Sequence, residues 1–187
     1  MFADNTLTPK EAIRLCALGI LATGPETYAA LASGIRHFVS RVVGPSPEVM
    51  GHSIELLRYE DLAEAVDGAG DQATLRITPA GRDAMRELLT ANVRASATEL
   101  TKLIVALKFR FLHLLEPADR QAQAELLIET TERELARLED LRQHHATEGG
   151  YLVAWLDHDI ELLDRRLHWL TGLRERLTAA TEPAPEL

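Results

Sequence analysis

The 187-residue sequence has a single cysteine, few aromatic residues and no long apolar run. Cys16 cannot form a disulfide within the chain, and it lies among apolar residues at helical spacing, which predicts a buried core thiol. The first residues lack a positively charged start followed by an apolar stretch, so we expect no export signal. No segment approaches roughly 18 consecutive apolar residues, which argues against a membrane span. We therefore expect a cytoplasmic globular protein.

Positive charge is also scarce. The chain has 20 Lys and Arg against 29 Asp and Glu, a net charge of -9, and residues 1–95 hold nine basic against twelve acidic side chains. Because nucleic-acid affinity depends largely on basic side chains that neutralise phosphates, any DNA-binding surface must be local. Nucleophile motifs and glycine-rich phosphate loops are missing as well, so we expect no enzymatic activity and no cofactor.

The N-terminal part contains clear helix starts, in which a hydroxyl residue precedes a proline. The hydroxyl can cap free backbone N–H groups, and proline fits the first helical turn. Thr8-Pro9 has Glu11 in the capping-box position and precedes an apolar run, which predicts a helix over residues 8–22.

Two more helices are expected before residue 60. The break at Gly24-Pro25 precedes a second helix, which we expect to begin near Glu26. Ser46-Pro47 predicts the start of a third helix, in which Ile54 and Leu57 lie on the inner face. This arrangement is typical of a helix-turn-helix.

The pattern then changes to two short segments, residues 62–66 and 73–78, which flank a glycine-containing stretch. Such a pattern is typical of a β-hairpin. Residues 79–92 return to helical periodicity. Three helices, a hairpin and a following helix predict a winged helix-turn-helix domain over residues 1–95.

From residue 96 onward only helical signals remain, and the predicted fold class is therefore mainly α. We expect a helical dimerisation domain over residues 96–180 and a disordered tail over residues 181–187. The last helix carries two adjacent apolar seams, which is more than its own chain can cover, so a second copy is the simplest partner. The predicted dimerisation residues are Leu152, Trp155, Leu156, Ile160, Leu163, Leu167, Trp169 and Leu170.

Two clusters in this half allow alternative interpretations. Trp155 and Trp169 either belong to the dimer core, which we favour, or line an effector cavity with Phe109 or Phe111. A second cluster could ligate zinc, but adjacent histidines diverge on a helix, so we expect a solvated helix end and no metal site. Its members are His144, His145, Glu148 and His158.

Because cations are few, the candidate DNA contacts can be named individually. Arg36 and Arg41 on the second helix are expected to contact phosphates, and hydroxyl groups near the start of the third helix could add hydrogen bonds. The full predicted set is Arg36, Arg41, Ser46, His52, Ser53, Arg58 and Arg76.

Several short stretches together show a family resemblance in their order and spacing. They are Leu7-Thr8-Pro9-Lys10-Glu11, Leu57-Arg58-Tyr59-Glu60-Asp61-Leu62, Leu75-Arg76-Ile77-Thr78-Pro79-Ala80-Gly81-Arg82, Lys108-Phe109-Arg110-Phe111-Leu112, His158-Asp159-Ile160 and Arg165-Arg166-Leu167-His168-Trp169-Leu170. The chain resembles the PadR family of transcriptional regulators, particularly its longer, virulence-activator-like subfamily. The family's glycine after the third helix is replaced by Asp61, which tolerates the left-handed conformation.

The resemblance implies a homodimer that reads double-stranded DNA with its third helix and wing. It further implies repression and, in some members, a small apolar effector. We therefore expect a dimeric, sequence-specific DNA-binding regulator. The alternative is a winged-helix dimer that acts as a protein- or ligand-binding module with weak or lost DNA binding, because the reading helix and the chain are acidic.

Overall fold

A computed structural model describes residues 6–44, 51–94 and 98–180. Contacts between Cα atoms divide the chain into two compact units, one of residues 1–92 and 97–115 and one of residues 93–96 and 116–187. The sequence predicts a boundary at residue 95. The first unit instead extends to residue 115, so it takes in one helix that was assigned to the second domain.

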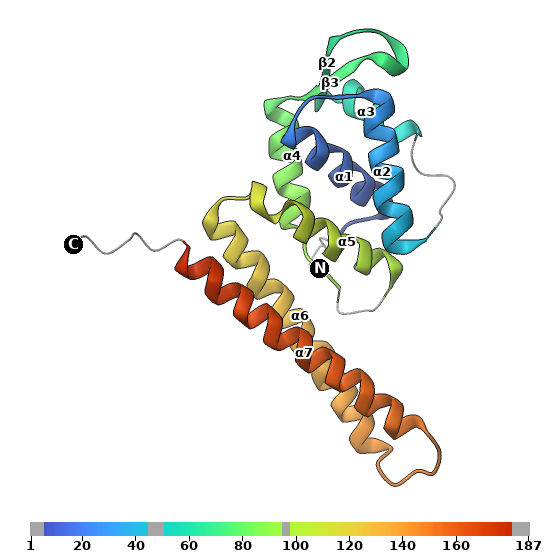
Figure 1. The fold of residues 1–187 in the computed structure, drawn as a ribbon. Helices are drawn as coiled ribbons and strands as arrows, with labels where there is room; N and C mark the ends of the chain where they lie inside the picture. The colour runs from blue at the N-terminus through green and yellow to red at the C-terminus, as the bar shows by residue number, and fades with distance from the viewer. Residues whose placement is uncertain (1–5, 45–50, 95–97, 181–187) are drawn as a thin grey trace, which may run out of the picture. The chain divides into compact units, whose positions relative to one another are not determined.

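The first unit is built around α1 (Pro9–Thr23), which is buried along most of its length. The predicted capping box is present, because Thr8 Oγ1 accepts from Glu11 N–H and Glu11 Oε2 accepts from Thr8 N–H at 2.7 Å. Four further helices pack on α1 (Figure 1): α2 (Tyr28–Val43), α3 (Gly51–Tyr59), α4 (Pro79–Thr90) and α5 (Glu99–Phe111). The structure confirms the mainly helical, winged helix-turn-helix fold.

The wing is a three-stranded antiparallel sheet rather than a simple hairpin. Its strands are β1 (Glu26–Thr27), β2 (Ala63–Asp67) and β3 (Thr74–Ile77), in the order β1-β3-β2, and η1 (Gly70–Gln72) lies between β2 and β3. The expectation that the second helix begins near Glu26 is therefore wrong by two residues. Glu26 pairs with Leu75 as a strand residue, and Thr27 caps α2 by accepting from Ala30 N–H.

The core of the first unit contains the single thiol and one close helix approach. Cys16 has no exposed surface, which confirms the buried core thiol, and burial raises its pKa to about 11. A Cβ atom on Gly19 would lie 2.5 Å from the Phe111 ring, so glycine is what lets α5 come this close to α1. Phe111 is therefore a core residue of this unit.

A buried lysine joins α4 to α5. Lys108 is 1% exposed, and its Nζ donates to the carbonyl oxygens of Leu89 (2.6 Å) and Ala91 (2.7 Å) at the end of α4. These carbonyls lie where the helix runs out of backbone donors. Burial lowers the pKa of Lys108 to about 7. The α5 helix ends in the short η2 (Leu112–Leu114).

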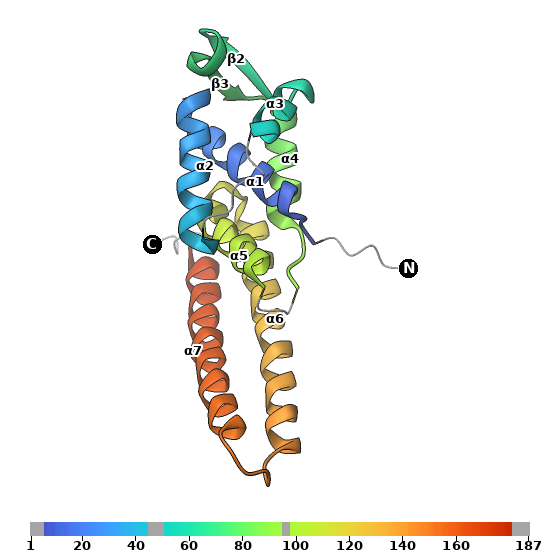
Figure 2. The same ribbon diagram turned by 90° about the vertical axis from the view of Figure 1, so that its right-hand side faces the viewer.

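The second unit is an antiparallel pair of long helices, α6 (Pro117–His144) and α7 (Leu152–Ala179), which lie side by side in Figures 1 and 2. Arg142 of α6 pairs with Asp157 of α7, and Arg174 pairs with Glu125 at 3.2 Å. None of the helices in the described part of the chain combines the length and apolar character that crossing a membrane requires. The predicted tail over residues 181–187 lies outside the described residues.

Candidate nucleic-acid interface

The end of α3 is fixed by a Schellman motif, in which backbone N–H groups beyond the helix bond back to its last turn. Leu62 N–H donates to the Leu57 carbonyl (2.8 Å), and Asp61 N–H donates to the Arg58 carbonyl (3.2 Å). Asp61 has a φ of 56°, so it adopts the left-handed conformation expected where the family usually has glycine. Helix α3 therefore ends at a defined residue before the chain enters β2.

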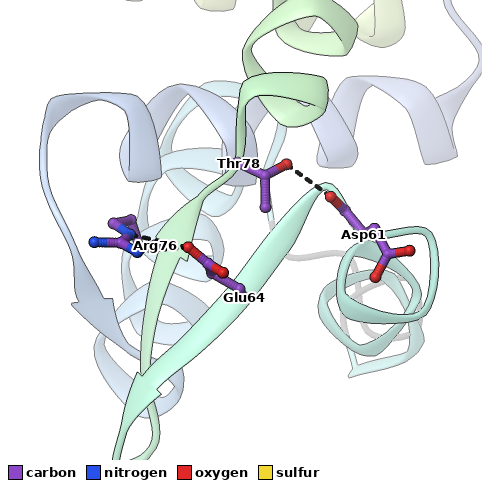
Figure 3. A network of polar contacts seen from close by, with 4 residues as sticks. All are labelled: Asp61, Glu64, Arg76 and Thr78. Atoms are coloured by element: carbon purple, nitrogen blue, oxygen red, sulfur yellow. Dashed lines mark hydrogen bonds and ion pairs between the residues drawn. The ribbon is translucent and has the colours of Figure 1, made fainter.

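Thr78 joins this helix end to the wing and to α4 (Figure 3). Its hydroxyl donates to the Asp61 carbonyl (2.7 Å) and accepts from Gly81 N–H (3.0 Å), while its own N–H donates to the Leu62 carbonyl (3.1 Å). A Cβ atom on Gly81 would lie 2.0 Å from that same Leu62 oxygen. The close backbone approach holds α3, the wing strands and α4 in one arrangement.

The outer face of α3 is only partly basic. Ile54 and Leu57 are fully buried against the unit, as predicted. Four residues of the last turns are exposed: Glu55, Leu56, Arg58 and Tyr59. Leu56 is 47% exposed and Tyr59 is 87% exposed, and neither is among the predicted DNA contacts. The signal that could have found them is their spacing from Ile54, because positions two and five residues further along a helix lie on its opposite side.

Three of the predicted DNA contacts fall on residues or side chains that the structure does not describe. His52 and Ser53 lie within α3, but their side chains are outside the described part of the structure. Ser46, with the predicted helix start at Ser46-Pro47, lies outside the described residues. These three DNA contacts stay predictions.

On the wing, Arg76 already has an acidic partner. It lies opposite Glu64 in the sheet register, and its Nη2 contacts Glu64 Oε1 at 2.6 Å (Figure 3). Both side chains are more than half exposed, so water screens the pair. A phosphate would have to compete with Glu64 for Arg76, and this cation therefore offers less than a full positive charge to DNA.

Arg36 and Arg41 are exposed on α2, and neither makes an ion pair within the described residues. The first turn of α2 lies at the wing, where Tyr28 N–H donates to the Ala73 carbonyl (2.9 Å). Arg41 is in the last turn, which at about 1.5 Å per residue lies roughly 20 Å further along the axis. The structure thus places Arg41 and the wing cation Arg76 at opposite ends of α2.

The predicted dimerisation residues of α7 separate into three groups. Leu156 and Leu170 are 0% and 2% exposed within the single chain, so these two are not available to a second copy. Ile160, Leu163 and Leu167 are half-buried. The remaining members face solvent, with exposed fractions of 37% for Leu152, 54% for Trp155 and 50% for Trp169.

The histidine cluster at the end of α6 shows one local pair. His145 Nδ1 lies 2.7 Å from Glu148 Oε1, three residues further along the chain. Within residues 6–44, 51–94 and 98–180, no three metal-ligating side chains converge in a way that could hold an ion. Phe111, one of the two phenylalanines predicted as alternative cavity residues, is buried beside Gly19.

A helix-turn-helix fixed to an antiparallel wing defines a winged-helix protein of the transcription-regulator class. The family model described as a putative AphA-like transcriptional regulator matches residues 2–174, and the chain belongs to this family. The expected PadR-like assignment is thereby confirmed, whereas the longer, virulence-activator-like subfamily stays a prediction. The family description indicates a transcriptional regulator.

Comparison with other proteins adds more distant likenesses. Bacillus subtilis PadR in complex with operator DNA shares 15% identity over 91% of this chain and 99% of that chain, with a TM-score of 0.39. The same protein in complex with p-coumaric acid gives 14% identity, 92% and 99% coverage and a TM-score of 0.36. The structure of smu.1604c from Streptococcus mutans UA159 gives 17% identity, 87% and 99% coverage and a TM-score of 0.39. At these TM-scores the likenesses add no support to a function, and no curated protein matches the chain significantly.

Proposed function

We propose that the protein is a dimeric, sequence-specific DNA-binding transcriptional regulator that works in the cytoplasm. The single observation that carries the proposal is the match of residues 2–174 to a family of transcriptional regulators. The winged helix-turn-helix of the first unit agrees with this match. In such domains the second helix of the helix-turn-helix enters the major groove and contacts base edges. Here that helix is α3, and the Thr78 contacts fix its end.

The proposed phosphate contacts come from cations that are exposed and without an acidic partner in the described structure. These are Arg36 and Arg41 on α2 and Arg58 near the end of α3. Arg76 can contact a phosphate once its ion pair with Glu64 is broken. In a dimer each cation is used twice, so a locally basic surface can form on a chain of net charge -9.

The proposed dimer depends on α7. One side of this helix packs within the chain, as the burial of Leu156 and Leu170 shows, while Trp155 and Trp169 stay exposed on another side. Large exposed apolar patches are typical of association surfaces, and a second copy covers the same surface on both chains. For the regulatory effect of DNA binding, the sequence resemblance implies repression that a small apolar effector relieves.

A second candidate function is a protein- or ligand-binding module with weak DNA affinity. It is favoured by the exposed outer face of α3, where Glu55 is acidic and Leu56 and Tyr59 are apolar or aromatic. Its DNA affinity would be uniform across sequences, because it would come only from phosphate contacts.

The deciding experiment is a footprint on the DNA upstream of the protein's own gene at stated salt concentrations. We expect a protected site, and we expect R36A and R58A to weaken binding and to lower the salt dependence by about one counterion each. K102A is the matched control, because Lys102 is an exposed cation on α5. Equal affinity for the upstream DNA and for unrelated DNA would favour the second function. A reporter fusion, with and without phenolic compounds, tests repression and effector response.

A further inference from the structure

The outer face of α3 carries one carboxylate and two large apolar side chains. Glu55 and Leu56 lie at the middle of this nine-residue helix, and Tyr59 ends it. Tyr59 follows Glu55 by four residues and Leu56 by three, so the three side chains are neighbours on one face of the helix. All three are exposed. This face therefore offers a hydrogen-bond acceptor beside an apolar surface.

The carboxylate of Glu55 differs from those of the two glutamates that follow it in the sequence. Glu60 is paired with Arg14 of α1, and Glu64 is paired with Arg76 on the wing. Glu55 makes neither an ion pair nor a side-chain hydrogen bond with the side chains that the structure describes. Because an ionised carboxylate can only accept hydrogen bonds, Glu55 is available to a ligand that brings a donor.

An acceptor beside an apolar surface matches the edges of two bases in the major groove. Cytosine presents a donor there, its 4-amino group, and no acceptor, whereas thymine is the base that presents a methyl group. Guanine presents two acceptors, which repel a carboxylate. Adenine presents its amino group next to the N7 acceptor, so it suits a carboxylate less well than cytosine does. The outer face of α3 thus fits pyrimidine edges best.

We propose that Glu55 and Leu56 determine the base specificity of this protein. Glu55 accepts a hydrogen bond from the 4-amino group of a cytosine, and Leu56 packs against the methyl group of a thymine in a neighbouring base pair. Tyr59 extends the apolar surface that covers this methyl group. The inference rests on the DNA binding proposed above and names the bases that α3 selects.

An acidic residue on a DNA-reading face lowers affinity, but it improves discrimination. Exposed cations such as Arg36 and Arg58 attract DNA of any sequence, because they contact phosphates. Where the base opposite Glu55 is not cytosine, the carboxylate loses water without gaining a suitable donor. Selectivity then comes from a penalty on the wrong base, which is an established way to separate competing ligands.

Selection from a pool of duplexes with a random central segment tests the assignment of Glu55. The unmodified chain should enrich sites in which a C·G pair lies next to a T·A pair. E55Q should change the preferred base at the cytosine position to adenine, because a glutamine amide pairs with both N6 and N7 of adenine. E87Q is the matched control, since Glu87 is exposed on α4, and it should enrich the same sites as the unmodified chain.

Replacing the contacted thymine by uracil in the selected duplex tests the assignment of Leu56, because it removes only the methyl group. This change should weaken binding of the unmodified chain by about 3- to 10-fold. L56A should bind the thymine and uracil duplexes with affinities equal within about two-fold, because the methyl group has already lost its partner. Circular dichroism of L56A verifies that its helix content is unchanged.

The two proposals fail in different ways. If the unmodified chain enriches no sequence, the sequence-specific regulator is wrong, and the base assignment fails with it. If the chain enriches a defined sequence, but E55Q selects the same bases or uracil binds as well as thymine, the regulator stands and the base assignment is wrong. The outer face of α3 would then be free for a protein partner, as in the second candidate function.

Discussion

The guanidinium of Arg76 lies 2.6 Å from the carboxylate of Glu64 across two neighbouring strands of the wing. The pair is exposed, so it contributes at most about 1 kcal/mol to stability. Its main consequence concerns the proposed DNA contact, because Arg76 is the wing cation predicted to contact DNA. In the free protein this cation is partly neutralised by its neighbour.

Removing the partner should therefore strengthen DNA binding. For E64Q we expect an affinity several-fold higher at low salt and a salt dependence steeper by about one counterion. R76A should weaken binding in the same assay. D83N is the control, because it removes one negative charge on α4 without touching Arg76. An equal gain with D83N would mean that overall charge, and not Arg76, is responsible.

Gly81 should not tolerate a side chain. A Cβ there would lie 2.0 Å from the Leu62 carbonyl oxygen, so the backbone would have to move at the joint between α3, the wing and α4. We expect G81A to lower the free energy of unfolding by about 2–4 kcal/mol. G34A, inside α2, is the matched control, since its new methyl group would meet only the Ile20 side chain of α1, at 3.5 Å. That variant should gain about 0.5–1 kcal/mol in urea unfolding.

Lys108 should make stability depend on pH. Its pKa is about 7 in the folded protein and 10.5 when exposed. Above pH 7 the unfolded chain therefore holds a proton that the folded chain has released, and stability rises with pH by up to about 1.4 kcal/mol per unit. Urea unfolding between pH 7 and 9 measures this slope. Above pH 9 the raised pKa of Cys16 acts in the opposite direction.

K108M should flatten this slope, and it should also lower stability at pH 7 by about 1–3 kcal/mol, because the Leu89 and Ala91 carbonyls lose their donor. K102M, at an exposed site on the same helix, should leave both the slope and the stability unchanged. An unchanged slope in K108M would show that another group titrates in this range.

Two adjacent residues of α7 should respond differently to truncation. Trp155 is 54% exposed and Leu156 is fully buried. L156A should lower the free energy of unfolding by about 2–5 kcal/mol, because it leaves a cavity. W155A should instead weaken dimerisation in sedimentation experiments, while the helix content stays the same. If W155A associates like the unmodified chain, this surface is not the dimer interface.

The sequence was sufficient for features that depend on neighbouring residues. The capping box of Thr8 and Glu11 and the left-handed Asp61 follow from local backbone chemistry, which a few adjacent residues determine. The two seams of α7 also follow from spacing alone. Spacing did not reveal which seam packs within the chain, because that depends on the position of α6.

Features that depend on distant residues were missed. Glu26 and Thr27 form a strand because β3, almost 50 residues later, supplies their partners, and two residues carry no periodicity. The pairing of Glu64 with Arg76 depends on the sheet register, which the bulge between Ala65 and Asp67 helps to set. These are properties of the folded sheet, so composition and spacing could not show them.

The central position of β3 in the sheet has a consequence for motion. This strand bonds β1 on one side, directly before α2, and β2 on the other, directly after α3. An isolated hairpin opens independently of the helices beside it. Here, breaking the hydrogen bonds of β3 would release β1, before α2, and β2, after α3, at the same time. Backbone amides of the sheet and of the two flanking helix ends should therefore exchange with deuterium at a common rate, as one cooperative segment.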